Sequence, residues 1–243
     1  MRTSQPLIFT LARIENLMQQ VSFDSASMKG SIITNTTLVR KEVLSETLDI
    51  FYDTIQSGLA VCPMIKIEED KGKERIRIKT ACSLTIDGVL LKKGIPVRPK
   101  GGGIIEVTDR EPARFTEMIM YWATTIDPID MLTAQGLTDI TGMMRTGDGR
   151  ILGNIQEAPM LARDRIEEVL DHLADAGFMG VLELGEPNMN VLGVSVERDH
   201  LGVALVGGTN LVAAARECGI EVDHESISDL TEISEMKHIE EMV

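Results

Sequence analysis

The sequence is poor in cysteine, histidine and aromatic residues, and it lacks long apolar runs. Its three cysteines, Cys62, Cys82 and Cys218, are odd in number and far apart, which fits neither a disulfide framework nor a zinc pattern. No two of the four histidines stand at a metal-binding helical spacing. No apolar run approaches the roughly 20 residues that a membrane helix needs. These absences predict a cytoplasmic protein with no metal, no cofactor and no membrane partner.

Basic residues are also scarce, since 24 Lys and Arg stand against 38 Asp and Glu and give a formal net charge of -14. Binding to nucleic acid needs a clustered basic surface, so we expect this chain not to hold nucleic acid by itself. Part of the imbalance lies in residues 221–243, which contain eight acids and one lysine. Acidity of this kind serves solubility in most proteins.

Apolar residues recur at helical spacing in the first segment of the chain. One stripe along a helix is marked by Leu7, Leu11, Ile14, Met18 and Val21. The stripe fits either a helix that faces the core or a helix that pairs with a second copy of the chain. A second amphipathic helix is predicted over residues 41–57, because Gly58 is a typical C-terminal stop. Strands are predicted at residues 31–34 and 59–67.

The middle of the sequence changes character. Between Arg75 and Val107, β-favouring residues alternate with turn signals such as Asp87-Gly88, which predicts a run of short hairpin strands. One or two short helices are expected from Asp127 to residue 146, with Asp127 as the N-cap. The remaining elements are predicted as a strand at 150–155, a helix at 161–176, a strand at 180–184, two further strands, and a helix that ends at Gly219.

Two strand–helix–strand units can be laid over each other. A shift of 119 positions brings Asn35 and Gly58 onto Asn154 and Gly177. A second block aligns at a shift of 99, where the segment 94–97 meets the segment 193–196. The alternative is two unrelated β-α-β units that share only generic patterning.

We therefore predict an α+β fold made of two tandem, duplicated β-α-β-plus-hairpin halves packed about a pseudo-twofold axis. Residues 1–28 form the N-terminal helix, residues 29–146 the first half, and residues 147–243 the second half with its acidic tail. Clefts between packed units are common ligand sites, so duplication favours a binding protein.

Several strings of the sequence are long and unusual. They are Ile151 to Pro159, Gly180 to Asn188, Leu201 to Asn210, Cys82 to Gly88, and Gly94 to Val97. These strings resemble the NrpR family of archaeal nitrogen-assimilation repressors, in the regulatory domain, and the similarity runs from about Ile14 to Met236. The resemblance implies a dimeric effector domain that binds 2-oxoglutarate, performs no catalysis and thereby controls repression. It also implies a separate winged helix-turn-helix domain or partner chain for DNA contact, because there is no room for one ahead of Ile14.

The local candidate for an anion site is Gly207-Gly208-Thr209-Asn210, which follows a predicted strand and opens a helix. Glycines let the backbone approach a ligand, and the first turn of a helix offers free N–H groups to an anion. The alternative is a tight turn in which Thr209 or Asn210 caps the helix.

A dicarboxylate with a keto group needs cations or oriented backbone N–H groups at both ends, and a hydroxyl or amide donor for the keto oxygen. Arginines suit the carboxylates and hydroxyls suit the keto oxygen. The candidates are Arg198, Arg110 and Arg114 for the carboxylates, and Ser83, Thr85 and Thr124 for the keto oxygen. Glu183 could orient an arginine or point to solvent.

Two other functions fit parts of the sequence. An enzyme acting on a small carboxylate would use Glu183, Cys82 or Asp87, and it would show a carboxyl or thiol of perturbed pKa in a cleft. A non-catalytic docking module would use the acidic tail to bind a basic protein.

Overall fold

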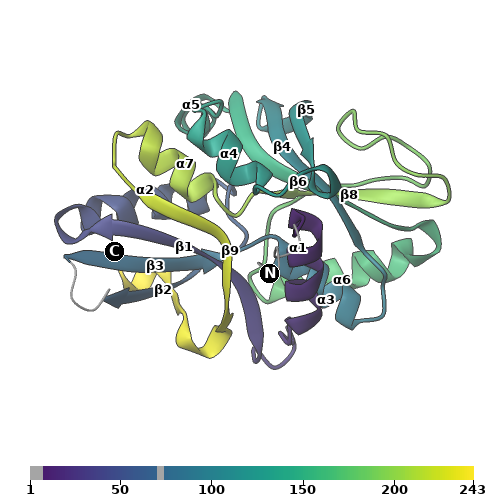
Figure 1. Cartoon of the computed structure of the whole chain (residues 1–243), viewed down its shortest axis with the longest axis horizontal. Coiled ribbons are helices and arrows are strands. Elements are labelled where there is room, and N and C mark those ends of the chain that lie inside the picture. Colours follow the sequence, from purple (N-terminus) through teal and green to yellow (C-terminus); the bar gives the residue numbers. More distant parts are fainter. Residues whose placement is uncertain (1–7, 70–73) are drawn as a thin grey trace, which may run out of the picture.

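Two five-stranded antiparallel sheets frame the chain, which a computed structural model describes over residues 8–69 and 74–243 (Figure 1). The first sheet, in the order β10-β2-β3-β1-β9, consists of β1 (Ser31–Arg40), β2 (Met64–Glu69), β3 (Arg75–Ala81), β9 (Asp223–Glu232) and β10 (Lys237–His238). The second sheet, in the order β5-β4-β6-β8-β7, consists of β4 (Arg98–Thr108), β5 (Glu111–Met120), β6 (Gly149–Pro159), β7 (Val181–Leu184) and β8 (His200–Val206). The two sheets, together with the helices, confirm the predicted α+β class.

Helices pack in pairs against the sheets. They are α1 (Thr10–Gln20), α2 (Leu44–Gln56), α3 (Leu84–Lys92), α4 (Pro128–Ala134), α5 (Ile140–Thr146), α6 (Arg163–Asp175) and α7 (Asn210–Glu217). The pair α2 and α7 shares a hydrophobic core with the first sheet, and α3 packs against α6 beside the second sheet (Figure 1). Among the described helices, none combines the length and apolar character needed to cross a membrane.

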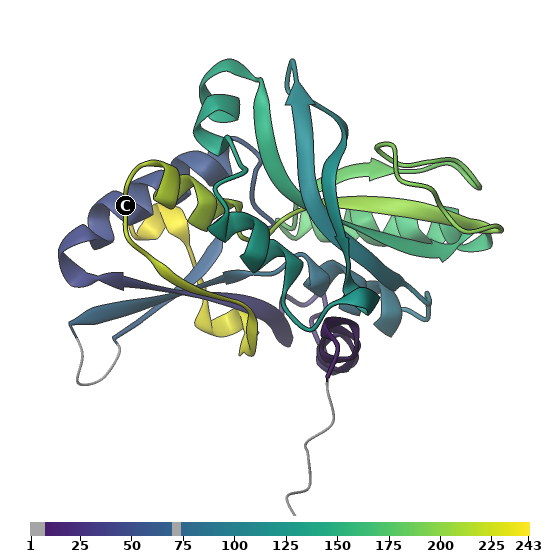
Figure 2. The ribbon, with the colours of Figure 1, turned by 45° about the horizontal axis from the view of Figure 1, so that its top comes forward.

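The two halves match element by element, and they exchange a helix and a strand. The elements β1, α2, β2 and β3 correspond in order to β6, α6, β7 and β8. After β3, however, α3 and β4 pass to the second sheet, and after β8, α7 and β9 pass to the first (Figure 2). The strand order β2-β3-β1-β9 therefore has the same pattern as β7-β8-β6-β4. This arrangement bears out a duplicated fold with pseudo-twofold symmetry.

The exchange of α3 and β4 for α7 and β9 also shows which segments of the second aligned block are equivalent. The segment 193–196 lies in the loop between β7 and β8, so the alignment at a shift of 99 is wrong. Gly94 and Gly219 are the equivalent pair, because each ends a helix of the exchanged unit with a positive φ, +81° and +85°. Each is followed by a buried isoleucine, Ile95 and Ile220. The predicted boundary between residues 146 and 147 falls between α5 and β6. Residues before it supply β4 to the second sheet, and residues after it supply β9 to the first sheet.

The run of hairpins predicted between residues 75 and 107 is wrong at its centre, where the chain forms α3. Nearly every residue of α3 is buried, so its apolar residues mark no single stripe that would identify a helix. Gly88 lies inside α3 and forms no turn. A Cβ on Gly88 would lie 2.4 Å from Cγ2 of Val21, so glycine lets the segment around α1 come close.

Two other predicted elements differ from the structure in extent. The strand predicted at residues 31–34 continues as β1 to Arg40. The strand predicted at residues 59–67 begins only at Met64, because residues 59–63 are buried without pairing in a sheet. The acidic C-terminal segment supplies β9, which pairs with β1 along most of its length.

The apolar stripe of α1 faces the core of the chain itself. Ile14, Met18 and Val21 are buried, and Leu11 is half-buried. Leu7 lies outside the described residues. The partners of this stripe include α3, so the buried part of the stripe is already used within one chain.

Candidate functional site

A small buried cavity lies where the two halves meet, beside the starts of α3 and α7. Its volume is about 20 Å³, which is room for one water molecule. Both halves contribute to its walls. The lining residues include Asn35, Cys82, Ser83, Tyr121, Asp127, Asn154, Gly207, Gly208, Thr209, Ser226 and Ile227. The cavity is therefore placed where a bound molecule would touch both halves at once.

One side of the cavity carries a chain of buried hydrogen bonds. Asn154 Nδ2 donates to Ser83 Oγ at 2.7 Å, and Gln156 Nε2 donates to Asn154 Oδ1 at 3.1 Å. The same Gln156 amide donates to Asp87 Oδ2 at 2.9 Å. Burial raises the pKa of Asp87 to about 7, against a smaller opposing effect of the hydrogen bond from Gln156. Gln156 Oε1 is buried without a partner among the described residues, so this side of the cavity is satisfied except at that oxygen, and it holds a carboxyl that is easily protonated.

The other side of the cavity has buried polar atoms without partners. Asn35 Nδ2 and Thr209 Oγ1 have no hydrogen-bond partner among the residues that the structure describes. Asn35 is the pseudo-symmetric counterpart of Asn154, whose amide is occupied by Ser83. A buried donor left without an acceptor costs about 1–3 kcal/mol. This side of the cavity therefore suits a ligand that brings acceptor oxygens.

Asp127 forms part of the cavity wall and caps α4, as predicted. Its Oδ1 accepts the backbone N–H groups of Ile129 at 2.9 Å and Asp130 at 3.2 Å. Burial, with a further effect of the neighbouring Asp130 charge, raises the pKa of Asp127 to about 6. Among the described lining residues there is an acidic side chain but no lysine or arginine.

Four of the predicted ligand residues meet at this cavity. Ser83 comes from the start of α3, and Gly207, Gly208 and Thr209 come from the loop before α7. A Cβ on Gly208 would lie 2.8 Å from Asn35 Nδ2, so the glycine lets this amide approach the loop.

Two neighbouring candidates serve the backbone instead. Asn210 bonds both backbone groups of Leu152, accepting from N at 2.8 Å and donating to O at 3.2 Å. Thr85 bonds both backbone groups of Ile33, each at 3.1 Å. Asn210 and Thr85 are pseudo-symmetric counterparts, and each ties the start of a helix to an inner strand of a sheet, β6 and β1 respectively.

The other predicted residues lie outside the cavity. Arg198 is on the loop between β7 and β8 with its side chain 92% exposed, and Arg110 is in the turn between β4 and β5. Glu183 accepts the backbone N–H of Leu192. Thr124 closes a turn with Ile126, and Arg114 pairs with Glu106.

Sequence reasoning missed Asn35, Asn154, Tyr121 and Asp127 as site residues. The two asparagines did carry a signal, because each is a polar residue in the middle of an apolar strand and the two align at the shift of 119. Tyr121 and Asp127 carried none, since their place in the wall depends on how the η2 turn (Tyr121–Ala123) and α4 pack on the exchanged strands.

Cys82 and the pair of His224 with Ser226 lack the surroundings that nucleophilic catalysis needs. Burial raises the pKa of Cys82 to about 12, which disfavours the thiolate that nucleophilic attack needs. His224 and Ser226 approach at 3.2 Å, but the other ring nitrogen of His224 meets Thr37 Oγ1 at 3.3 Å and no carboxylate. In a catalytic triad, a carboxylate orients that second nitrogen.

The chain is similar to nitrogen regulators over almost its whole length. A family model described as "NrpR regulatory domains NRD1 and 2" matches residues 7–238. The global nitrogen regulator NrpRI of Methanosarcina mazei is 32% identical over 95% of this chain and 73% of its own length. NrpR of Methanocaldococcus jannaschii and NrpR of Methanococcus maripaludis are 30% and 32% identical, and this chain spans 40% of each. A crystal structure of a nitrogen repressor-like protein from Methanococcus jannaschii matches with a TM-score of 0.85 and 29% identity, covering 96% of this chain and 100% of that one.

Proposed function

The chain belongs to the NrpR regulatory domain family, and from this membership we propose that it is the effector-sensing part of a repressor of nitrogen assimilation. The effector is 2-oxoglutarate or a similar small dicarboxylate, bound in the cavity between the two halves. The relatives are named as regulators, and the function proposed for this chain is binding without turnover.

The observation that carries this proposal is the pair of orphaned groups, Asn35 Nδ2 and Thr209 Oγ1, in a cavity that both halves line. Carboxylate and keto oxygens are acceptors and would satisfy both groups. The cavity is several times too small for a five-carbon dicarboxylate, so the ligand requires a more open arrangement of the halves. A ligand that binds one arrangement better shifts the population toward it, which is what a sensor needs.

DNA contact in this proposal comes from a separate winged helix-turn-helix domain or from a partner chain. The formal charge of -14 disfavours direct contact between this chain and phosphates.

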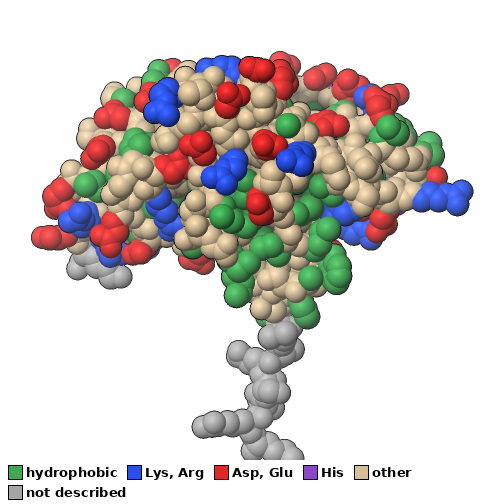
Figure 3. Space-filling model, turned by 90° about the horizontal axis from the view of Figure 1, so that it is seen from above, with side chains coloured by type: hydrophobic (Ala, Val, Ile, Leu, Met, Phe, Trp, Pro, Cys, Tyr) green, Lys and Arg blue, Asp and Glu red, His purple; other side chains and the backbone are tan. Residues whose placement is uncertain are grey.

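The chain acts as a homodimer in the same proposal. The buried stripe of α1 is used internally, so the interface requires another surface. Figure 3 shows hydrophobic side chains gathered beside the N-terminal segment. The large exposed apolar side chains near the start of α1 are Ile8, Phe9, Trp122 and Ile126. Apolar patches of this kind mark interaction sites on soluble proteins.

Calorimetric titration with 2-oxoglutarate, with glutamate and succinate as comparison ligands, tests the effector assignment. We expect binding selective for the keto acid in the wild type. Thr209→Val removes one orphaned hydroxyl and is expected to weaken binding roughly tenfold, the size of one hydrogen bond to a charged group. Thr80→Val is the matched control, because Thr80 Oγ1 is also buried without a partner but does not line the cavity.

Equal losses in Thr209→Val and Thr80→Val would place the ligand elsewhere. An absence of heat with all three anions at several millimolar would remove 2-oxoglutarate as the effector and favour the docking-module alternative.

A further inference from the structure

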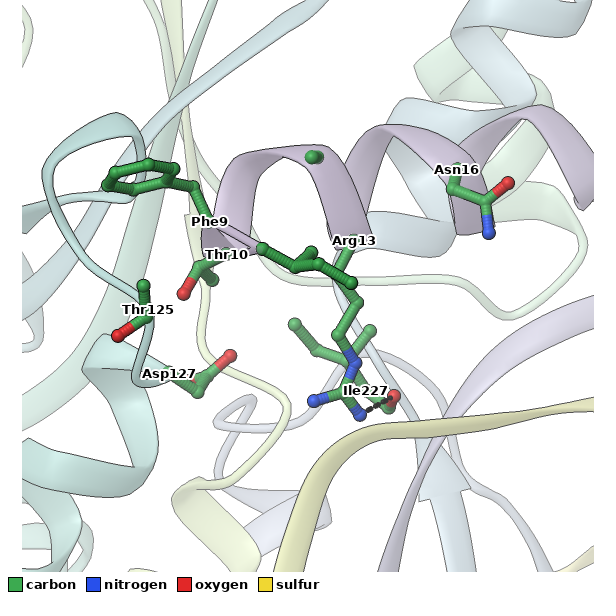
Figure 4. Close-up of a pocket in the computed structure, with 9 residues that line it drawn as sticks. Phe9, Thr10, Arg13, Asn16, Thr125, Asp127 and Ile227 are labelled. Atoms are coloured by element: carbon green, nitrogen blue, oxygen red, sulfur yellow. Dashed lines mark hydrogen bonds between the residues drawn. The ribbon is translucent and has the colours of Figure 1, made fainter. Parts of the chain in front are cut away.

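A surface pocket of about 520 Å³ opens beside the start of α1 (Figure 4). Its walls come from the first turns of α1, from the segment 125–127 and from β9. The lining residues are Ile8, Phe9, Thr10, Ala12, Arg13, Asn16, Thr125, Asp127 and Ile227. Arg13 is the one cation among these described lining residues, and the described first turn of α1 has neither a side-chain cap nor an acidic residue. The pocket therefore combines one guanidinium and a helix N-terminus with the carboxyl of Asp127 at a half-apolar surface.

This pocket and the buried cavity share a wall. Asp127 and Ile227 line both of them. Figure 4 shows the Arg13 side chain reaching toward Ile227 from the pocket side. Ile227 therefore contacts both Arg13, the one cation among the described lining residues of the pocket, and Asn35, which carries an orphaned donor of the cavity.

Ile227 is in a conformation that a β-branched residue rarely adopts, with φ at +52°. It lies at the register shift between β1 and β9, where the ladder between the strands is interrupted. Two side chains hold it there. Asn35 Oδ1 accepts the backbone N–H of Ile227 at 3.0 Å, and Arg13 Nη2 donates to its backbone oxygen at 2.8 Å.

Arg13 and Asn35 consequently face each other across one residue. Because a single residue spans at most about 3.6 Å, both side chains are within reach of one small ligand. The guanidinium of Arg13 has only a long contact with a carboxylate. Its nearest acid is Glu225 at 3.6 Å, and its side chain is 46% exposed. A bidentate carboxylate would bind a guanidinium more strongly than a backbone carbonyl does.

We propose that Arg13 is a carboxylate subsite that extends the effector cavity into the surface pocket, and that the Ile227 bulge is the gate between them. The inference rests on the proposed effector function and deepens it. One carboxylate of a dicarboxylate binds Arg13, and the rest of the ligand reaches the donors of Asn35 and Thr209. When Arg13 turns to the ligand, Ile227 loses one of its two restraints, and its strain favours opening.

The proposed subsite makes α1 part of the conformational response to ligand binding. Arg13 belongs to α1, and the same helix is tied to the segment after η2 by Thr10, whose backbone N–H donates to Thr124 O at 2.9 Å. Trp122 is in η2, which contacts α1, and it is the single tryptophan of the chain. Occupation of the subsite is therefore expected to change the emission of Trp122.

The test compares Arg13→Gln with Arg165→Gln in the full chain. Arg165 is a matched control, because it too donates to a backbone carbonyl, that of Lys93 at 2.7 Å, but far from the pocket in α6. We expect Arg13→Gln to weaken 2-oxoglutarate binding at least tenfold and to abolish the Trp122 response. Arg165→Gln is expected to stay within twofold of the wild type. Glu225→Gln removes the competing acid and is expected to tighten binding two- to threefold without disturbing the fold.

The outcomes separate the two proposals. Wild-type binding of 2-oxoglutarate with equal affinity in Arg13→Gln overturns the subsite and leaves the effector function standing. No binding of 2-oxoglutarate, but Arg13-dependent binding of succinate, glutarate or malate, supports the subsite, removes 2-oxoglutarate as the effector and leaves a similar dicarboxylate in its place. No binding of any of these anions overturns both. Circular dichroism shows whether each variant is folded. If Arg13→Gln does not fold, the binding affinity of Glu225→Gln tests the subsite instead, and an affinity equal to that of the wild type overturns it.

Discussion

Asp87 shows how one buried side chain couples the stability of this chain to pH. The carboxyl is fully buried and accepts a hydrogen bond from the amide of Gln156. Its pKa is raised by burial from 3.8 to about 7. Between these values the native state holds a proton that the unfolded state has released. The free energy of unfolding therefore falls as the pH rises from about 4 to about 7.

Asp87→Asn is expected to remove this pH dependence. The asparagine oxygen can still accept from Gln156, and no charge is buried at high pH. Above pH 7 the variant should be more stable than the wild type by a few kcal/mol, on the order of 1.4 kcal/mol for each pH unit of the shift. Urea denaturation at pH 4.5, 6 and 8 measures the difference, with Asp171→Asn on the exposed face of α6 as the control. If the free energies of unfolding of variant and wild type differed by the same amount at all three pH values, burial would not raise the pKa of Asp87.

At the scale of single residues, the sequence predicted part of the site and could not predict the rest. The loop 207–210 and Ser83 were identifiable because glycines and hydroxyls before a helix are a local signal. Asn210 and Thr85 carry the same local signal, yet they bond the strand backbone, because their direction is set by the neighbouring sheet. The contact between Arg13 and Ile227 carried no local signal, since the two residues are more than 200 positions apart in the sequence.

Among the elements, α3 depends most directly on a single contact. Gly88 allows Val21 to pack against the helix, and a Cβ there would lie 2.4 Å from the valine methyl group. Gly88→Ala is expected to cost about 1–3 kcal/mol, the usual penalty for overpacking a core. The double variant Val21→Ala with Gly88→Ala removes the contact with Cγ2 but keeps the Val21 Cβ at 2.7 Å, so it should recover only part of the loss. Thermal denaturation of the three proteins measures both effects. A stable Gly88→Ala protein would mean that α1 and α3 adjust without cost.

The elements that the sequence predicted well are those with one buried face. The helices α2 and α6 show apolar residues at helical spacing and end before Gly58 and Gly177. The helix α3 is enclosed between α1 and α6 and is apolar on nearly every side, so its pattern was read as strands. Local propensity cannot distinguish these cases, because burial on all sides is a property of the assembled fold.

For the whole molecule, the exchange predicts that neither half folds alone. A fragment of residues 1–146 lacks β9, which pairs with β1, and a fragment of residues 147–243 lacks β4, which pairs with β6. We expect each purified fragment to be unfolded or aggregated, and the two co-expressed fragments to form a stable complex. Circular dichroism and analytical ultracentrifugation check this expectation. A monomeric, cooperatively folded fragment would contradict it.

The full chain is accordingly expected to unfold in one step. The order of the strands was beyond the reach of sequence reasoning, which identified a duplication but assigned each strand to its own half. The local residue pattern of a strand does not indicate which of two similar sheets the strand joins. The choice depends on packing between α7 and α2 and between α3 and α6, over long sequence separations.

The exchange of β4 and β9 also sets the order of events on the ribosome. The strand β1 emerges early, but its neighbour β9 lies near the end of the chain. Until β9 has been made, one edge of β1 has no strand beside it, and exposed strand edges are prone to pair with other chains. The nascent polypeptide therefore needs shielding at β1 until β9 has been made, and slow translation between these two strands or a shortage of chaperones would prolong this exposure.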